Sequence, residues 1–318
     1  MNKSNLETIL DYGSSKIRIG VFDKEFPKNN YFISENCKTI FKKKKLTFEN
    51  SEEKILKLIK VIEKKTDTHL NDIDIMFDTT DFTIVDLAIK KKFDGRLVYV
   101  DDIKYLLQEL NSIIKNNYLN FKIVHFIITR ITADDENFDS IPENNLNCKE
   151  LIIEVKFICL PDIIYNEIIT HFKKKFVSIN KIYCTSYVKS FSYKEQFKEY
   201  KKIFFLDIGF EKSCLTIYEK NKLKLVRFLS IGGNHITKDI SKILKIPIEE
   251  SEEIKKNLYK LITTYSNMNN KKNNLIDLEI FRNINIENRS IEFLKKIIFA
   301  RVDEIIDLIF NKINFDDF

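Results

Sequence analysis

The sequence contains no tryptophan, and only 6 of its 318 residues are glycine and 4 are proline. A glycine kept in a glycine-poor chain more often serves a backbone requirement, so each glycine turn is a candidate site. Aromatic bulk comes from 26 phenylalanines and 13 tyrosines, and hydrophobic residues make up 44% of the chain. This share supports well-packed cores, and the length allows two or three domains.

The cysteines are few and odd in number: the chain has 5, widely spaced and without a C-x-x-C pair, beside 4 scattered histidines. This usage predicts a reducing compartment, with no disulfide framework and no zinc site. Runs of about 18 apolar residues are also lacking, so we expect no membrane-spanning segment. The first residues lead into a strand and are not typical of a signal peptide.

No charge of one sign dominates, because 53 basic residues are mixed with 47 acidic ones for a net charge of +6. Three lysine runs, at 42–45, 90–92 and 173–175, are expected to be solvated faces with acidic residues nearby. The alternative is a surface for phosphate-rich partners, either nucleic acid or anionic lipid. We predict no nucleic-acid partner.

The spacing of apolar residues predicts a mixed α/β chain. The expected helices comprise one carrying Ile55 to Ile62 and others at 101–114, 161–176, 187–200, 236–244, 249–262 and 290–313. The expected strands lie at 6–10, 17–22, 73–77, 82–89, 121–131, 151–160, 179–185, 203–206, 214–218, 224–229 and 275–280. Between 82 and 161 the order strand, helix, strand, strand predicts a small inserted α+β unit.

Two predicted hairpins place an aspartate directly before a glycine turn: DYGSSK at 11–16 and DIG at 207–209. Their recurrence predicts a duplicated fold that holds one phosphate chain between its halves. We expect Asp11 and Asp207 to hold Mg²⁺ through water. The groups expected to donate to phosphate oxygens, or to allow their close approach, are Gly13, Ser14, Ser15, Lys16, Gly209 and Ser213. Taken singly, such a sequence is also typical of a simple turn.

Two further segments complete a candidate nucleotide site. Gly232, Gly233 and Asn234 open a helix, whose unpaired N–H groups and positive dipole end are expected to face outward as an anion site. Glu252 and Lys255 lie three residues apart on the next helix and can reach ribose hydroxyls and an adenine edge. The alternatives are an ordinary turn and a surface ion pair. The four segments together, in this order, are more specific than any one.

These residues resemble the bacterial cell division protein FtsA family, within the actin, Hsp70 and sugar-kinase superfamily. The resemblance rests on DYGSSK, DIG, SIGGNHITKDI at 230–240 and ESEEIK at 250–255. It implies an α/β actin-like ATPase fold of duplicated ribonuclease-H-like lobes, with an inserted α+β subdomain of SHS2 type called 1C. The implied boundaries are 1–82 with 163–200 for lobe 1A, 83–162 for 1C, 201–245 for an incomplete lobe 2A and 246–318 for 2B.

The resemblance also implies a function and cofactors, ATP and Mg²⁺. It implies a scaffold on the cytoplasmic face of the inner membrane at the division site, which polymerises and links the FtsZ ring to that membrane. FtsZ would bind through 2B and later division proteins through 1C. Alternatives are a phosphotransferase or chaperone-type ATPase of the same superfamily, or a truncated fragment that binds no nucleotide.

The chain departs from the family pattern in three places. Phe210 and Glu211 replace further glycines and threonine in the second loop, and Glu211 is expected to repel phosphate. The segment 184–190 holds no carboxylate or glutamine to position water, so we expect slow hydrolysis or none. The family's last glycine-rich motif and amphipathic membrane helix are missing, which predicts a truncated product or a need for another chain.

Overall fold

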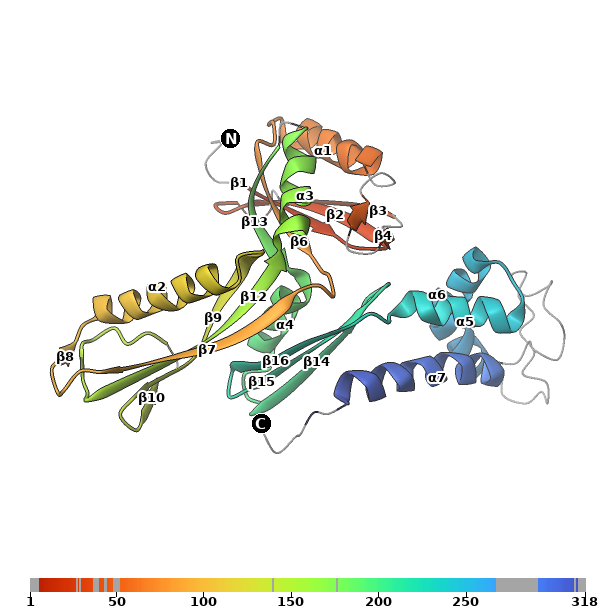
Figure 1. The fold of residues 1–318 in the computed structure, drawn as a ribbon. Coiled ribbons are helices and arrows are strands. Elements are labelled where there is room, and N and C mark those ends of the chain that lie inside the picture. The colour runs from red at the N-terminus through yellow and green to blue at the C-terminus, as the bar shows by residue number, and fades with distance from the viewer. Residues whose placement is uncertain are drawn as a thin grey trace. The chain divides into compact units, whose positions relative to one another are not determined.

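The computed structural model describes residues 6–26, 28, 30–36, 40–42, 45–47, 52–138, 140–175, 177–266, 291–311 and 313. The strand predicted at 275–280 lies outside these residues. The chain divides into two compact units, one of Met1–Phe204 with Thr216–Val226 and one of Phe205–Leu215 with Arg227–Phe318 (Figure 1). The four-part division implied by the resemblance stays a prediction.

A five-stranded sheet with the order β13-β6-β1-β2-β3 forms the centre of one part of the first unit. Its strands are β1 (Leu6–Tyr12), β2 (Lys16–Asp23), β3 (Tyr31–Asn36), β6 (Asp72–Phe77) and β13 (Ser178–Cys184). β2 is antiparallel to both β1 and β3, whereas β6 is parallel to both β1 and β13. The carboxyl ends of β1, β6 and β13 therefore meet at one edge of the sheet, where Tyr12 pairs with Phe77 and Phe77 with Cys184.

Two helices with apolar residues at helical spacing pack on this sheet, and a third helix directly follows β13. Their bounds are α1 (Glu52–Thr66), α3 (Asp162–Lys173) and α4 (Thr185–Gln196). In α1 the predicted face is confirmed, since Ile55, Leu58, Ile59 and Ile62 are all buried. α1 packs on β2 and β3, and α3 packs on β13. A short hairpin of β4 (Ile40–Lys42) and β5 (Lys45–Thr47) precedes α1.

The inserted subdomain, between β6 and α3, has the predicted α+β make-up and lies within the first compact unit. Its elements are β7 (Thr83–Lys92), β8 (Leu97–Val98), α2 (Val100–Asn117), β9 (Phe121–Ala133), β10 (Glu136–Phe138), β11 (Leu146–Asn147) and β12 (Glu150–Pro161). Four strands form an antiparallel sheet ordered β10-β9-β12-β7, and β8 pairs with β11. Ile103, Leu106 and Leu110 of α2 are buried against one face of this sheet.

A three-stranded sheet ordered β14-β15-β16 follows, and its residues are shared between the two units. The strands are β14 (Lys202–Ile208), β15 (Ser213–Glu219) and β16 (Lys222–Leu229), and the helices of the second unit are α5 (Gly233–Leu244), α6 (Ile248–Ser266) and α7 (Ile291–Phe310). Ile240, Ile254 and Leu294 belong to the core that joins these three helices. The Arg301 guanidinium of α7 also binds both carboxylate oxygens of Asp239 on α5, at 2.6 and 3.0 Å.

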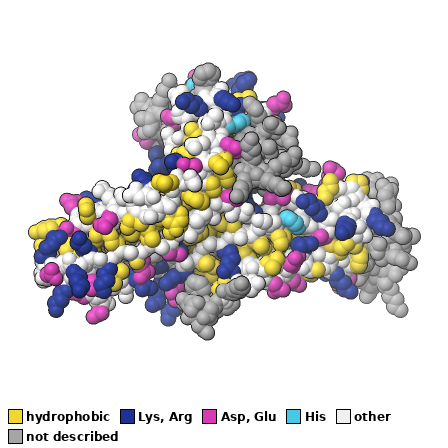
Figure 2. All heavy atoms as spheres, in the orientation of Figure 1, with side chains coloured by type: hydrophobic (Ala, Val, Ile, Leu, Met, Phe, Trp, Pro, Cys, Tyr) yellow, Lys and Arg dark blue, Asp and Glu magenta, His cyan; other side chains and the backbone are white. Residues whose placement is uncertain are grey.

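The surface carries both signs of charge, as the composition predicts. Figure 2 shows Lys and Arg side chains interspersed with Asp and Glu on the face that it displays. Lys90 to Lys92 are exposed on β7, and Lys90 lies 2.5 Å from Glu150, which agrees with a solvated lysine run. Among the described helices, none combines the length and the apolar character needed to cross a membrane.

Candidate functional site

The first predicted phosphate loop is a tight turn between β1 and β2. The Gly13 N–H donates to the Lys16 carbonyl at 3.2 Å, and Tyr12 pairs with Ile17 across the hairpin. A Cβ on Gly13 would lie 2.7 Å from the Lys16 carbonyl oxygen, so the turn requires glycine. Ser14 is partly exposed and Ser15 exposed. The structure therefore brings the five predicted residues of this loop together.

Asp11 lies beside that turn and is paired with a residue that the sequence analysis missed. The Arg18 Nη1 donates to Asp11 Oδ2 at 2.6 Å, and the two residues are opposite each other in the β1–β2 register. Burial raises the pKa of Asp11 above its usual value, although the charges of Arg18 and Lys189 oppose that rise. A buried carboxylate whose ionised form is disfavoured is stabilised by a nearby cation.

A second carboxylate stands at the same sheet edge, and sequence reasoning missed it too. Asp78 follows β6, and its Oδ1 and Oδ2 accept hydrogen bonds from the Ser186 N–H at 3.1 Å and the Ser186 hydroxyl at 2.6 Å. Because Ser186 is in the first turn of α4, the Asp78 carboxylate caps that helix. Asp78 also acts on Asp11, since its charge contributes to the raised pKa of Asp11.

His125 connects the inserted subdomain to this edge. Its Nε2 accepts the Cys184 N–H at 2.9 Å, and its ring lies 4.7 Å from the ring of Tyr187, between centroids. Burial lowers the pKa of His125 to about 4, so the imidazole is neutral at pH 7 and can accept this hydrogen bond. A strand of the inserted subdomain thus contacts the residue directly before α4.

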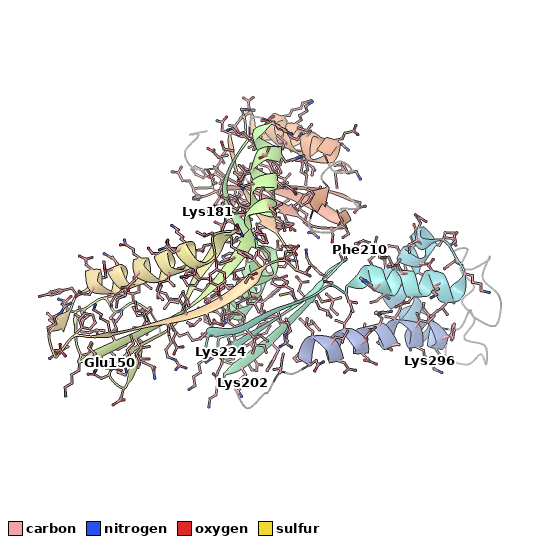
Figure 3. The ribbon with its side chains drawn as sticks, viewed as in Figure 1. Glu150, Lys181, Lys202, Phe210, Lys224 and Lys296 are labelled. Carbon is pink, nitrogen blue, oxygen red and sulfur yellow. The ribbon has the colours of Figure 1, made fainter. Side chains whose placement is uncertain are left out.

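The second predicted loop lies in the second unit, and it is built on a close backbone approach. Gly209 N–H donates to the Lys212 carbonyl at 2.9 Å, which repeats the turn at Gly13. Gly232 lies against this loop, where an added Cβ would be 2.6 Å from the Gly209 carbonyl oxygen and 2.7 Å from the Lys212 nitrogen (Phe210 of this loop is labelled in Figure 3). Gly232 is therefore required by packing.

The start of α5 differs from the predicted outward anion site. The Gly233 N–H donates to the Gly209 carbonyl at 2.8 Å, and the Asn234 N–H donates to the Phe210 carbonyl at 2.7 Å. The next amide, of His235, donates to the Gly232 carbonyl at 2.9 Å. The first two amides of the helix therefore donate to carbonyls of the second loop, and the third donates to the carbonyl of Gly232.

Side chains strengthen the same contact between loop and helix. Asn234 Nδ2 donates to Glu211 Oε1 at 2.8 Å, so the acidic residue expected to repel phosphate is held by the helix start. Ser213, fully buried, donates its hydroxyl to the Ile231 carbonyl at 2.7 Å. Asp207 is partly buried and lies one residue before Ile208, the last residue of β14.

Glu252 and Lys255 are brought together, but they bind α5. Lys255 Nζ lies 2.7 Å from Glu252 Oε2 and donates to the Gly233 carbonyl at 2.8 Å. The Thr237 hydroxyl lies 2.5 Å from the same Glu252 oxygen. Burial raises the pKa of Glu252, but the hydrogen bonds from Lys255 and Thr237 outweigh it and leave the pKa below its usual value. The pair joins α6 to the start of α5.

Each unit therefore contains one of the two predicted phosphate loops. The loop with Asp11 lies in the first unit, and the loop with Asp207 lies in the second. In the part of the chain that the structure describes, no three His, Cys, Asp or Glu side chains are grouped as metal ligands.

Comparison with solved structures shows the class of fold. The chain resembles the PilM-PilN type IV pilus biogenesis complex with a TM-score of 0.52 and 11% identity, over 94% of this chain and 87% of that chain. A weaker match, with a TM-score of 0.41 and 12% identity, is to MreB5 of Spiroplasma citri bound to ADP, over 98% of this chain and 80% of that one. The predicted α/β actin-like fold is confirmed.

Comparison with families gives a narrower similarity. The family model for cell division protein FtsA matches residues 204–292. The cell division protein FtsA of Helicobacter pylori, in two strains, is 32% identical over 79 residues. That match covers 25% of this chain and only 16% of the relative. The match to the family model covers the second loop and the start of α5.

The close contact at Gly232 predicts that one added methyl group lowers the free energy of unfolding. Gly232→Ala places a Cβ within 2.8 Å of three backbone atoms of the second loop, so the loop or the helix must shift. We expect a loss of about 1–3 kcal/mol in the free energy of unfolding, measured by urea denaturation. Lys238→Ala, on an exposed position of α5, should change it by less than about 0.5 kcal/mol. Equal effects of the two substitutions would contradict the packing role of Gly232.

The Glu252 contacts predict a pH-dependent contribution to stability. Because the folded-state pKa is lowered, this contribution is present above the usual glutamate pKa and is lost as the pH falls through the lowered value. Glu252→Gln should cost about 1–3 kcal/mol in the free energy of unfolding at pH 7. The difference from wild type should shrink with acidification, whereas Glu253→Gln, at an exposed neighbour, should show neither effect. A pH-independent difference would mean that the charge of Glu252 is unimportant.

Proposed function

We propose that this chain is an ATP-binding, actin-like scaffold protein of bacterial cell division. The observation that carries the proposal is the position of the FtsA-like match, residues 204–292, which spans Gly209, Gly232, Glu252 and Lys255. These are the residues that join the second loop, α5 and α6 in the structure. The actin-like fold supports the same proposal, because duplicated lobes of this kind carry one phosphate loop each.

In the proposed function, ATP binds with Mg²⁺ between the two loops. Asp11 and Asp207 would hold the cation through water, and the turns at 13–16 and 209–212 would face the phosphates. The burial of Asp11 fits this role, because its raised pKa reflects an ionised form that a cation would stabilise. Mg²⁺ would supply charge neutralisation of the phosphates. Since the first amides of α5 already donate to carbonyls, the loops are the proposed phosphate contacts.

Hydrolysis is proposed to be slow, with nucleotide serving mainly to stabilise a closed arrangement. The connection at 184–190 has no carboxylate of its own, and the Asp78 carboxylate beside it accepts two hydrogen bonds from Ser186. A carboxylate occupied in capping a helix is poorly placed to activate water.

The proposed partners follow the same similarity. Self-association into filaments, FtsZ binding through residues 246–318, and binding of later division proteins through residues 83–162 are the proposed assembly contacts. The proposed location is the division site, on the cytoplasmic face of the inner membrane. The match covers only 16% of the relative, so we propose these assembly contacts from a local similarity.

Nucleotide binding is tested by titration with a fluorescent ATP analogue and Mg²⁺. Asp11→Asn and Asp207→Asn should each weaken binding by about tenfold, which corresponds to about 1.4 kcal/mol. Because the pKa of Asp11 is raised, wild-type affinity should also begin to fall, as the medium is acidified, at a higher pH than an ordinary aspartate would give. The control is Asp307→Asn, the same change at an exposed position of α7.

Equal binding by all four proteins would overturn the proposed site, as would a wild type that does not bind. A steady-state ATPase assay separates the scaffold from the alternative enzymes. Turnover faster than about 1 per second, the low end of enzyme rates, would favour a phosphotransferase or chaperone-type ATPase.

A further inference from the structure

An arginine of the first unit already binds a carboxylate that the proposed function assigns to Mg²⁺. The Arg18 Nη1 donates to Asp11 Oδ2 at 2.6 Å, and the Asp11 side chain is 19% exposed whereas that of Arg18 is 54% exposed. Hydrogen bonds between a guanidinium and a carboxylate are among the stronger ones in proteins. Both residues belong to the first compact unit, so the pair is defined within one part of the chain.

The hairpin of β1 and β2 sets up this pairing through its backbone. Asp11 and Arg18 are opposite each other in the antiparallel register, and the turn at Gly13 closes the hairpin. Ile17 and Ile19 are buried on one face of β2, so Arg18 between them lies on the other face. Directly opposite residues of an antiparallel pair share a face, which places the guanidinium beside the carboxylate.

Other charges that act on Asp11 come from two neighbouring elements. Burial raises the pKa of Asp11, and the charge of Asp78, directly after β6, adds to that rise. The hydrogen bond and charge of Arg18 oppose the rise, and so does the charge of Lys189 on α4. The Asp78 carboxylate accepts two hydrogen bonds from Ser186 at the start of α4. The charge of Asp11 is thus compensated mainly by a cation of its own hairpin.

A second cation at Asp11 would come close to the guanidinium. Mg²⁺ would add two positive charges next to the charge of Arg18, and like charges repel strongly at short range. Mg²⁺ also keeps several of its waters, so a hydrated ion needs more room beside the carboxylate than one guanidinium nitrogen does. Because the Arg18 side chain is largely exposed, it can leave the carboxylate and keep its charged end in water.

We propose that Arg18 competes with Mg²⁺ for the carboxylate of Asp11, and that it thereby sets the Mg²⁺ concentration that nucleotide binding requires. This competition rests on the proposed function, since it concerns the same carboxylate. Arg18 holds Asp11 when nucleotide is absent and releases it when Mg²⁺ arrives with the phosphates. If the pair is formed about nine-tenths of the time, Asp11 is available for only about one-tenth, which lowers its apparent Mg²⁺ affinity about tenfold.

The test is a Mg²⁺ titration of the full chain at a fixed concentration of the fluorescent ATP analogue. The measured quantity is the Mg²⁺ concentration at half-maximal analogue binding. Arg18→Gln removes the competing charge and should lower this midpoint by about three- to tenfold. Arg18→Lys keeps a positive charge opposite Asp11 and should stay closer to the wild-type midpoint. Lys189→Gln removes the positive charge on α4, and a competition by direct contact predicts a smaller shift for it than for Arg18→Gln.

The titration separates this competition from the proposed function. Wild-type protein that binds no analogue at any Mg²⁺ concentration would overturn the proposed function, and the competition with it. Normal maximal binding by Arg18→Gln with an unchanged midpoint would overturn the competition alone. Equal shifts in Arg18→Gln and Lys189→Gln would also overturn it, because they would show a general effect of charge in place of contact. Circular dichroism of the three variants verifies that they are folded.

Discussion

The backbone contact between the second loop and the start of α5 is the constraint on which the second unit depends. The Gly233 N–H donates to the Gly209 carbonyl at 2.8 Å, and the Asn234 N–H donates to the Phe210 carbonyl at 2.7 Å. This approach is possible only because residue 232 has no side chain. α6 is joined to this helix start through Thr237, Glu252 and Lys255. The core that contains Ile240, Ile254 and Leu294 packs α5, α6 and α7 together. In the first unit the corresponding constraint is the sheet order, which brings the ends of β1, β6 and β13 to one edge.

The contact also changes how an anion site at a helix start should be understood. A helix N-terminus binds anions when its first amides are available to them. Here carbonyl oxygens of a neighbouring loop already accept those hydrogen bonds. The glycine pair therefore positions the second loop against the helix start. At α4, a carboxylate from another strand caps the helix, so both helix starts next to the predicted loops already have acceptors.

The sequence predicted much of the fold for identifiable reasons. Strongly apolar strands and helices with one apolar face, such as α1, were placed close to their observed bounds, and so was the inserted subdomain. Arg18 was within reach of sequence reasoning, because a hairpin closed by Gly13 and Lys16 sets Arg18 opposite Asp11. Asp78 and His125 were not, because their partners lie 108 and 59 residues away, and only the parallel sheet and the docking of β9 bring them together. The sequence predicted an ion pair of Glu252 and Lys255 as an alternative, but not the hydrogen bond from Lys255 to the Gly233 carbonyl.

Amide hydrogen exchange at Gly233 and Asn234, in protein without nucleotide, tests the central contact most directly. If the loop carbonyls accept these amides as described, both should exchange at least about 100-fold more slowly than in an unstructured peptide, as hydrogen-bonded amides of a folded region do. Exchange of both at the unprotected rate would show that the start of α5 is open, and it would restore that helix start as an anion site.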